Sequence, residues 1–220
     1  MIQSSVMLRS FLQPLTPFVD SKETILKRFI VATLAMIVGF STTTAGADTF
    51  SASRVRMLIH GSNQFSEQLG ASVHFIPAGN LLGEVAPLIY GSFDWTPIPE
   101  LTISPTVGWT FKPDEMVVSL RLAPKIGKFW GWVDLEERPT SRAFYWFVQA
   151  QYQVTSFLHI GAEQESWGDF HDFSTASHGG GPNVLLRFGR NFGTDLALHA
   201  RSLGGSAVNL EFFSRIHLFL

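Results

Sequence analysis

Hydrophobic and polar residues alternate along the middle and the end of this chain. Between residues 101 and 111 the odd positions carry apolar residues, and the even positions carry small or polar ones. A period of two is typical of a β-strand whose two faces meet different surroundings. The segment predicts a strand with an apolar face (Leu101, Ile103, Pro105, Val107, Trp109 and Phe111) and a second face (Thr102, Ser104, Thr106, Gly108 and Thr110).

The same alternation on both sides of Thr155–Ser156 predicts a β-hairpin. Apolar residues occupy the even positions of residues 146–154, glutamines occupy odd positions, and residues 158–165 continue the two faces after the turn. One face holds Trp146, Val148, Ala150, Tyr152, Val154, Leu158, Ile160 and Ala162, and the other holds Gln149, Gln151, Gln153, His159, Gly161, Glu163 and Glu165. Such a hairpin fits an apolar medium on one side and polar groups on the other.

Residues 208–220 predict a last strand whose charged residues fall on one face. A soluble β-sandwich would bury the apolar faces of these strands between two sheets, whereas a membrane barrel would leave them accessible. We expect an accessible outer surface that includes Leu158, Ile160, Val184, Leu186, Leu196, Leu198, Leu210, Ile216 and Leu218.

Two features favour the barrel over the sandwich. Gln, His, Glu and Arg residues occupy the middle of the predicted strands, where a sandwich would place fewer of them. Trp95, Trp109, Trp146 and Tyr152 lie near apolar strand ends, as aromatic residues do at bilayer interfaces. The predicted fold class is all-β, a closed antiparallel transmembrane β-barrel.

Strand counting from the C-terminus gives ten strands, with eight or twelve as alternatives. They are expected at 207–220, 194–203, 182–189, 157–165, 142–154, 126–134, 115–123, 99–111, 84–95 and 70–77. Residues 52–60 also alternate, but a single-chain barrel with both ends in the periplasm needs an even number of strands. We therefore assign residues 48–69 to a periplasmic N-terminal segment or plug, and residues 70–220 to the barrel.

Loop lengths predict which end of the barrel faces outward. Short turns are expected at Pro97–Ile98, Pro124–Lys125, Thr155–Ser156 and Asn191–Phe192, and a long external loop at Ser166–Gly181. Short periplasmic turns and longer external loops are typical of outer-membrane barrels.

The N-terminal 47 residues resemble a secretory signal peptide with an N-terminal extension. Lys27–Arg28 precedes the mostly apolar run Phe29–Phe40, and Ala45–Gly46–Ala47 supplies a small-residue cleavage site. A membrane anchor is the alternative, but about 12 apolar residues span only about 18 Å of the roughly 30 Å hydrocarbon core. We expect cleavage after Ala47.

Composition narrows the classes of partner. Hydrophobic residues make up 45% of the chain and charged residues 15%, below the roughly 25% typical of soluble domains. A net charge of -2 without a basic cluster argues against nucleic acid as a partner, and the absence of Cys excludes disulfides and thiolate metal sites.

In its export signal and its amphipathic C-terminal strand, the chain resembles bacterial outer-membrane β-barrel proteins as a class. That class usually ends in an aromatic residue, whereas this chain ends in Leu220, with Phe212, Ile216 and Leu218 at the alternating positions before it. The resemblance covers residues 70–220. It implies export through the periplasm to the outer membrane of a Gram-negative bacterium, with outer-membrane lipid, lipopolysaccharide and the barrel assembly machinery as partners.

Two sets of polar residues are candidates for function. The inward-facing set, expected to form a charged network in the lumen, contains His159, Glu163, Arg187, Asp195, His199, Arg201, Glu211, Arg215 and His217. The second set, expected in the external loop, contains Glu165, Asp169, His171, Asp172, Ser174 and His178. We interpret that loop as a solvated surface, with a divalent-cation site of Glu165, Asp169, His171 and Asp172 as the alternative. No cofactor and no catalytic residue is predicted.

The last two hairpins allow a prediction of register. A turn centred on Gly205 makes opposed residue numbers sum to 410, which pairs His199 with Glu211 and Asp195 with Arg215. A turn centred on Asn191 makes them sum to 382 and places Arg187 opposite Asp195. Asp195 would then lie between two arginines and close the periplasmic end of the lumen.

The leading functional hypothesis is a non-enzymatic barrel with a structural or surface-interaction role and a narrow, charge-filled lumen. A small solute channel is the first alternative, because a path lined by Arg and His could conduct solutes. A lipid A-modifying hydrolase is the second. The 3-O-deacylases of this kind carry a His-x-Ser-Asn motif, which neither His171–Ser174 nor His199–Ser202 matches.

Overall fold

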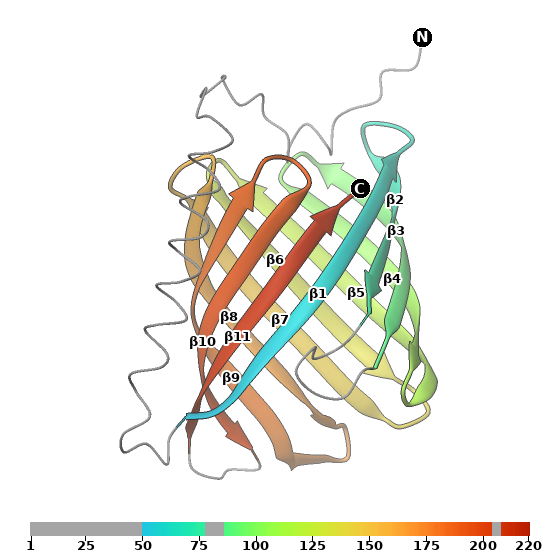
Figure 1. Cartoon of the computed structure of the whole chain (residues 1–220). Coiled ribbons are helices and arrows are strands. Elements are labelled where there is room, and N and C mark those ends of the chain that lie inside the picture. Colours follow the sequence, from blue (N-terminus) through green and yellow to red (C-terminus); the bar gives the residue numbers. More distant parts are fainter. Residues whose placement is uncertain (1–49, 78–85, 204–207) are drawn as a thin grey trace.

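The computed structural model of the chain describes residues 50–77, 86–203 and 208–220 (Figure 1). Within these ranges eleven strands close into one barrel, which confirms the predicted all-β barrel. None of the residues described belongs to a helix long and apolar enough to cross a membrane. The strands are β1 (Phe50–Gln64), β2 (Leu69–Ile76), β3 (Leu88–Ile98), β4 (Leu101–Phe111), β5 (Asp114–Ile126), β6 (Phe129–Arg138), β7 (Ala143–Gln153), β8 (Leu158–Asp169), β9 (Asp172–Phe188), β10 (Phe192–Leu203) and β11 (Asn209–Phe219).

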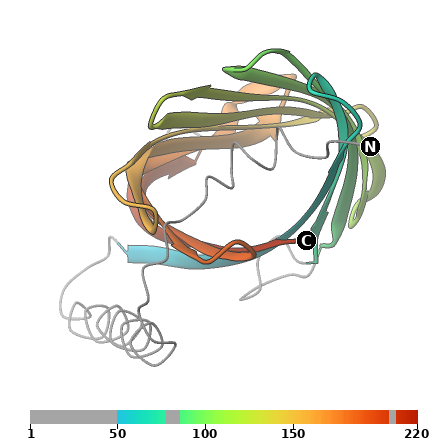
Figure 2. The ribbon, with the colours of Figure 1, turned by 90° about the horizontal axis from the view of Figure 1, so that it is seen from above.

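Strand β1 closes the barrel. The strands from β2 to β11 pair antiparallel with their neighbours in chain order, while β1 pairs antiparallel with β2 and parallel with β11. The strands therefore form a complete ring when viewed from above (Figure 2). In the parallel seam, Met57 lies opposite Ile216 and Ile59 opposite Leu218.

The predicted even strand number is wrong, and so is the assignment of residues 48–69 to a segment outside the barrel. The ten predicted strands correspond to β2–β11, and Phe50–Gln64 adds an eleventh strand to the wall. The expectation of an even strand number failed because a parallel pairing of the first and last strands satisfies the backbone hydrogen bonds of both and leaves no open edge. The predicted signal peptide and its cleavage site, residues 1–47, lie outside the described residues.

The predicted long loop Ser166–Gly181 is also wrong. Strands β8 and β9 continue through this segment and leave only Phe170–His171 between them. Its polar residues and glycines are typical of a loop, but here the glycines have a packing role. A Cβ at Gly179 would lie 2.6 Å from the Arg201 guanidinium carbon, and a Cβ at Gly181 would lie 2.0 Å from the Leu198 carbonyl oxygen.

The two faces of the wall are reversed relative to a soluble protein. Most of the buried side chains are polar or charged, and they include Thr102, Ser104, Thr106, Gln149 and Glu163. Large apolar side chains cover the outside. None of the nine side chains predicted for the outer surface is buried, and Ile160, Leu198 and Leu210 are 47%, 40% and 40% exposed. The alternation predicted from the sequence is confirmed.

The barrel has two rims. The C-terminal rim carries Leu220 and the connections 65–68, 99–100, 127–128, 154–157 and 189–191. The N-terminal rim carries the start of β1, the adjoining ends of β2 and β3 and of β10 and β11, and the connections 112–113, 139–142 and 170–171. The predicted turns at Pro97–Ile98 and Pro124–Lys125 are displaced, since these residues belong to β3 and β5.

One of the two predicted registers is confirmed. His199 lies opposite Glu211 and Asp195 opposite Arg215. The preceding hairpin is shifted, because Phe192 pairs with Phe188 and Arg187 with Gly193. The turn is centred on Arg190, next to Gly189 with a φ of 73°, a left-handed conformation that favours glycine. The predicted placement of Arg187 opposite Asp195 is therefore wrong.

Disulfide cross-linking tests the parallel seam. Neighbouring strands lie about 4.7–4.9 Å apart, within the Cα separation of about 4.4–6.8 Å that a disulfide needs. The chain has no cysteine, so Met57→Cys with Ile216→Cys should form an internal disulfide on oxidation, seen as a mobility shift in non-reducing gels. Met57→Cys with Phe212→Cys is the control, about 13 Å out of register. Equal cross-linking of both pairs, or of neither, contradicts the seam.

Candidate functional site: the charged lumen

Four charged side chains form a closed ring of ion pairs inside the barrel, which we call the charge ring: Arg54, Glu165, Arg201 and Glu211. Arg201 donates to Glu165 over 2.9 Å and to Glu211 over 2.6 Å. Arg54 donates to the same two carboxylates. Each carboxylate therefore accepts from two guanidinium groups, an arrangement that compensates buried charge far better than a single pair does.

The charge ring joins strands that are distant in sequence. Arg54 comes from β1, Glu165 from β8, Arg201 from β10 and Glu211 from β11. Glu165 is fully buried, with 0% of its side chain exposed. Its other oxygen lies 3.5 Å from Arg56 Nη2, and Arg56 also lies 3.4 Å from the Tyr145 hydroxyl of β7. The ion pairs thus cross the interior of the barrel.

A second cluster lies beside the ring, around Glu163 and Asp195. Arg215 donates to Glu163, and to Asp195 over 2.8 Å. Gln149 donates to the same two carboxylates, over 3.0 and 2.7 Å. His199 Nε2 lies 2.9 Å from Glu163, while its Nδ1 lies 3.2 Å from Arg201 Nη2. His199 therefore connects this cluster to the charge ring.

Aromatic rings cover the arginines. The guanidinium carbon of Arg201 lies 4.1 Å from the centroid of Trp167, and that of Arg54 lies 4.2 Å from the centroid of Phe213. Arg215 lies 4.5 Å from Phe147. Cation–π contacts of this kind are strongest where water is excluded. The rings thus stabilise the cations and fill space that water would otherwise occupy.

Three histidines lie near the C-terminal rim. Nδ1 of His60 lies 2.8 Å from Nδ1 of His74, and Nε2 of His60 lies 3.1 Å from Nδ1 of His217. Phe219 stacks on both His60 and His217, with centroids 5.0 and 5.9 Å away. Nε2 of His217 lies 4.0 Å from Asp195, which links this stack to the second cluster.

Strands β3 to β6 carry their own polar contacts. Arg121 donates to Asp134 over 3.0 Å, and its guanidinium lies 4.3 Å from the ring of Tyr90. The Tyr90 hydroxyl of β3 donates to Glu136 of β6. Ser104 donates to Asp94 over 2.6 Å. Charged groups are therefore paired along the lumen, not only at one level.

All nine residues of the predicted lumen set lie on the inner face of the wall. Six of them lie together: Glu163, Asp195, His199, Arg201, Glu211 and Arg215. His217 is next to Asp195. The remaining two contact aromatic rings, since His159 accepts from Trp130 Nε1 over 3.0 Å and Arg187 lies 5.4 Å from the ring of Phe219.

Sequence reasoning missed Arg54, Arg56 and Gln149 as members of the network. The alternation of residues 52–60 indicates a strand that carries both arginines, but the requirement for an even number of strands excluded that strand from the predicted barrel. The alternation predicts the correct face for Gln149 but does not indicate its partner. Its contact with Asp195 joins β7 to β10, a pairing between strands that are not neighbours, which strand patterns do not reveal.

The six residues predicted in the external loop are not one group. Glu165 belongs to the charge ring, and His178 lies on the outer face, its Nδ1 2.8 Å from the Ser166 hydroxyl. Asp169 and Asp172 accept from the backbone N–H groups of His171 and Ser174 at the turn, over 2.7 and 3.1 Å. The divalent-cation hypothesis fails because Glu165 is separated from the others. Across the part of the chain that the structure describes, no cluster of three or more His, Asp or Glu is arranged to hold a metal ion.

The Ser166–His178 contact resembles half of a hydrolase site, but the residues around it differ from one. The Ser166 side chain is fully buried, at 0% exposure. Its second neighbour is the amide of Gln164, whose oxygen accepts from Trp146 over 2.8 Å. A nucleophile needs access to substrate and a base oriented by a third group. We interpret these residues as a hydrogen-bonded polar strip on the outer wall.

Comparison with known proteins adds no functional assignment: no family model matches the chain, and no curated protein matches it significantly.

The charge ring yields a stability prediction. Replacing Glu165 with Gln keeps the shape of the side chain but leaves Arg54, Arg56 and Arg201 facing one another with Glu211 alone. Breaking a buried ion pair costs about 3–5 kcal/mol. Urea unfolding followed by tryptophan fluorescence should show that loss for Glu165→Gln. The control Glu100→Gln, in an exposed turn, should change stability by less than about 0.5 kcal/mol. Similar midpoints for both variants would contradict the ring.

Proposed function

We propose that this chain is an integral outer-membrane β-barrel of a Gram-negative bacterium, with a sealed lumen and a role carried by its outer surface. The observation that carries the proposal is the reversed distribution of side chains. Ion pairs and hydrogen-bonded polar groups fill the inside, and apolar side chains cover the outside. In water such an exterior would aggregate, whereas in a bilayer it is the favourable arrangement.

Aromatic residues near both rims support a membrane position. Trp95, Phe129 and Phe157 lie close to the C-terminal rim and are 46%, 60% and 45% exposed. Near the N-terminal rim, Trp109 and Phe111 are 42% and 55% exposed. Aromatic belts at the two levels of the lipid headgroups are typical of membrane barrels. Strands of 11 residues such as β4 match the roughly 9–11 residues that a tilted strand needs to cross a bilayer.

The connections suggest an orientation. The largest sequence separations between consecutive strands, from Ile76 to Leu88 and from Leu203 to Asn209, join strand ends at the N-terminal rim, and longer loops face outward in outer-membrane barrels. The C-terminal rim would then face the periplasm. Cleavage after Ala47 would leave only Asp48 and Thr49 before β1, so the strand could begin at the outer rim without a long segment crossing the membrane.

The ion pairs and hydrogen bonds across the interior argue against a solute channel. They join β1 to β8 through Arg54 and Glu165, and β7 to β10 through Gln149 and Asp195. Tyr90 and Glu136 join β3 to β6. A solute would have to break several of these buried contacts in order to pass, each at a cost of a few kcal/mol. A surface role is therefore favoured over transport.

Cell fractionation tests the location. The full chain expressed in a Gram-negative host should be recovered in the outer-membrane fraction with an N-terminus at Asp48, as measured by mass spectrometry. The control carries Lys27→Glu and Arg28→Glu, which remove the positive charge before the apolar run and should block export. Recovery of the unaltered chain in the cytoplasm or the inner membrane would refute the assignment.

Planar bilayer recording tests the sealed lumen. The purified protein should produce no discrete conductance steps, because paired charges and aromatic rings occupy its interior. A general porin purified and inserted in the same way is the positive control. Regular steps from this protein alone would establish an open path and replace the surface role with that of a channel.

A further inference from the structure

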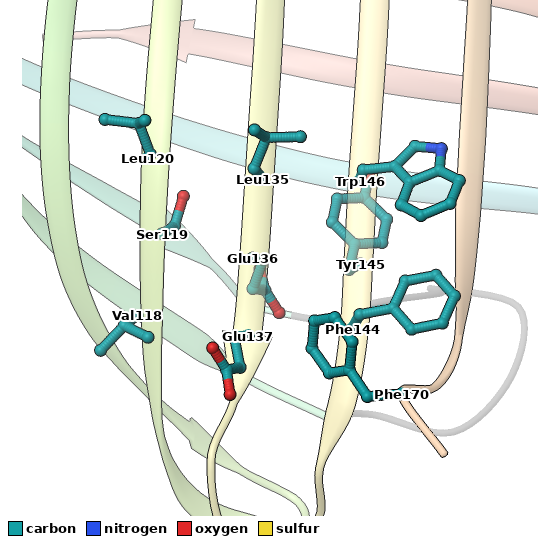
Figure 3. A pocket seen from close by; sticks show the side chains of 10 residues that line it. All are labelled: Val118, Ser119, Leu120, Leu135, Glu136, Glu137, Phe144, Tyr145, Trp146 and Phe170. Atoms are coloured by element: carbon teal, nitrogen blue, oxygen red, sulfur yellow. The ribbon is translucent and has the colours of Figure 1, made fainter. Parts of the chain in front are cut away.

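An apolar groove runs over the outer surface of β5, β6 and β7 near the N-terminal rim (Figure 3). Its volume is about 470 Å³, within the range of about 300–1,000 Å³ typical of ligand sites. Behind the groove, the side chains of Ser119, Glu136 and Tyr145 belong to the inner face. Its apolar lining consists of Val118, Leu120, Leu135, Phe144, Trp146 and Phe170.

The groove exists because two aromatic side chains lean away from it, as Figure 3 shows. Trp146 lies opposite Leu135 in the strand register, but its indole N–H donates to Gln164 of β8 over 2.8 Å. Phe144 also leans toward β8, where Gly168 leaves it room, since a Cβ there would lie 3.1 Å from the Phe144 ring. The space beside Leu135 is therefore held open by specific contacts.

Beside Phe170, which lines the rim end of the groove, lie two exposed polar side chains that can meet an anion, Arg142 and His171. The backbone N–H of Phe170 donates to the carbonyl of Arg142 over 3.0 Å, and Arg142 Nη1 lies 3.1 Å from His171 Nε2. Arg142 has a φ of 58°, a left-handed conformation unusual for a residue other than glycine. Strained positions of this kind concentrate at functional sites.

We propose that this groove binds lipid A, one acyl chain lying along Leu135 and Trp146 and one phosphate group at Arg142 and His171. The proposal rests on the outer-membrane assignment, which places the N-terminal rim in the outer leaflet. An acyl chain matches an apolar groove continuous with the outer wall, and arginine is the side chain best suited to phosphate. Glu137, exposed across the groove, would repel a second phosphate there, which limits the site to one.

Native mass spectrometry of the purified protein, after removal of its signal peptide, tests the site. The probes are diphosphoryl lipid A, the same lipid without phosphates, and phosphatidylglycerol. Leu135→Trp fills the groove and should weaken binding of diphosphoryl lipid A at least tenfold. Val73→Trp is its control, because Val73 is 51% exposed on the outer face of β2, a strand that does not line the groove; binding should be unchanged.

The phosphate contact is tested by Arg142→Gly, which removes the guanidinium and suits the left-handed backbone. Binding of diphosphoryl lipid A should fall at least fivefold, and binding of the dephosphorylated lipid should not change. Arg190→Gly, in the exposed turn at the other rim, should bind like the unaltered chain. Glu137→Gln should bind at least as tightly, because a repelling charge is lost. Variants are compared only after heat-modifiable gel migration shows that they are folded.

Three outcomes would overturn the proposal. Equal lipid A binding by Leu135→Trp and Val73→Trp would mean that the lipid merely surrounds the barrel. An unchanged affinity of Arg142→Gly would remove the phosphate site, and equally tight phosphatidylglycerol would assign the groove to glycerophospholipid. A protein found in the outer membrane without selective lipid A binding would refute the groove alone, whereas failure to reach the outer membrane would refute the proposed function itself.

Discussion

The structure depends on the requirement that buried charges be paired. Glu165 lies inside the barrel with no exposed surface, and a carboxylate in that position is tolerable only with cationic partners and hydrogen bonds. Arg54 and Arg201 meet this need, and they share Glu211 as a second partner. Because these residues come from four strands, the ring holds together parts of the wall that are far apart in sequence. The cross-section of the barrel is thereby tied to the geometry of one charge cluster.

The same cluster accounts for the unusual closure. A barrel of antiparallel strands alone would end at an even number, yet here β1 joins β11 in parallel. Parallel pairs are slightly less favourable per residue than antiparallel ones. The seam receives additional support from side chains, since Arg54 reaches from β1 to Glu211 of β11 and His60 to His217. Ion pairing inside the lumen and backbone pairing in the wall thus stabilise the same strand.

The outside of the barrel follows a different rule from the inside. Its surface is mostly apolar, and the polar side chains that remain on it serve neighbours in the wall. Gln164 accepts from Trp146 and contacts Ser166, which lies 2.8 Å from His178. This strip turns an indole toward β8 and leaves a groove beside Leu135. A local hydrogen bond on the outer surface therefore shapes the one feature of that surface to which we assign a ligand.

Local features of the sequence determined much of this protein. The alternation of apolar and polar residues determined which side of each strand faces inward. A predicted turn centre in the last hairpin gave the strand register, and with it the opposed pairs His199–Glu211 and Asp195–Arg215. These inferences succeeded because side-chain direction and hairpin register depend on near neighbours. Where the turn itself was misplaced by one residue, at Arg190, the predicted contact of Arg187 with Asp195 was lost.

Only the tertiary structure decided the closure and the partners across the lumen. The sequence showed Arg54 and Arg56 on an alternating segment, but nothing local indicated that this segment would lie parallel to the last strand. Glu165 and the residues after it looked like a solvated loop until the arginines opposite were in place. Contacts such as Arg54–Glu165 and Gln149–Asp195 form between strands that are not adjacent. They exist because the barrel closes, and closure of the barrel is a property of the whole chain that no single segment encodes.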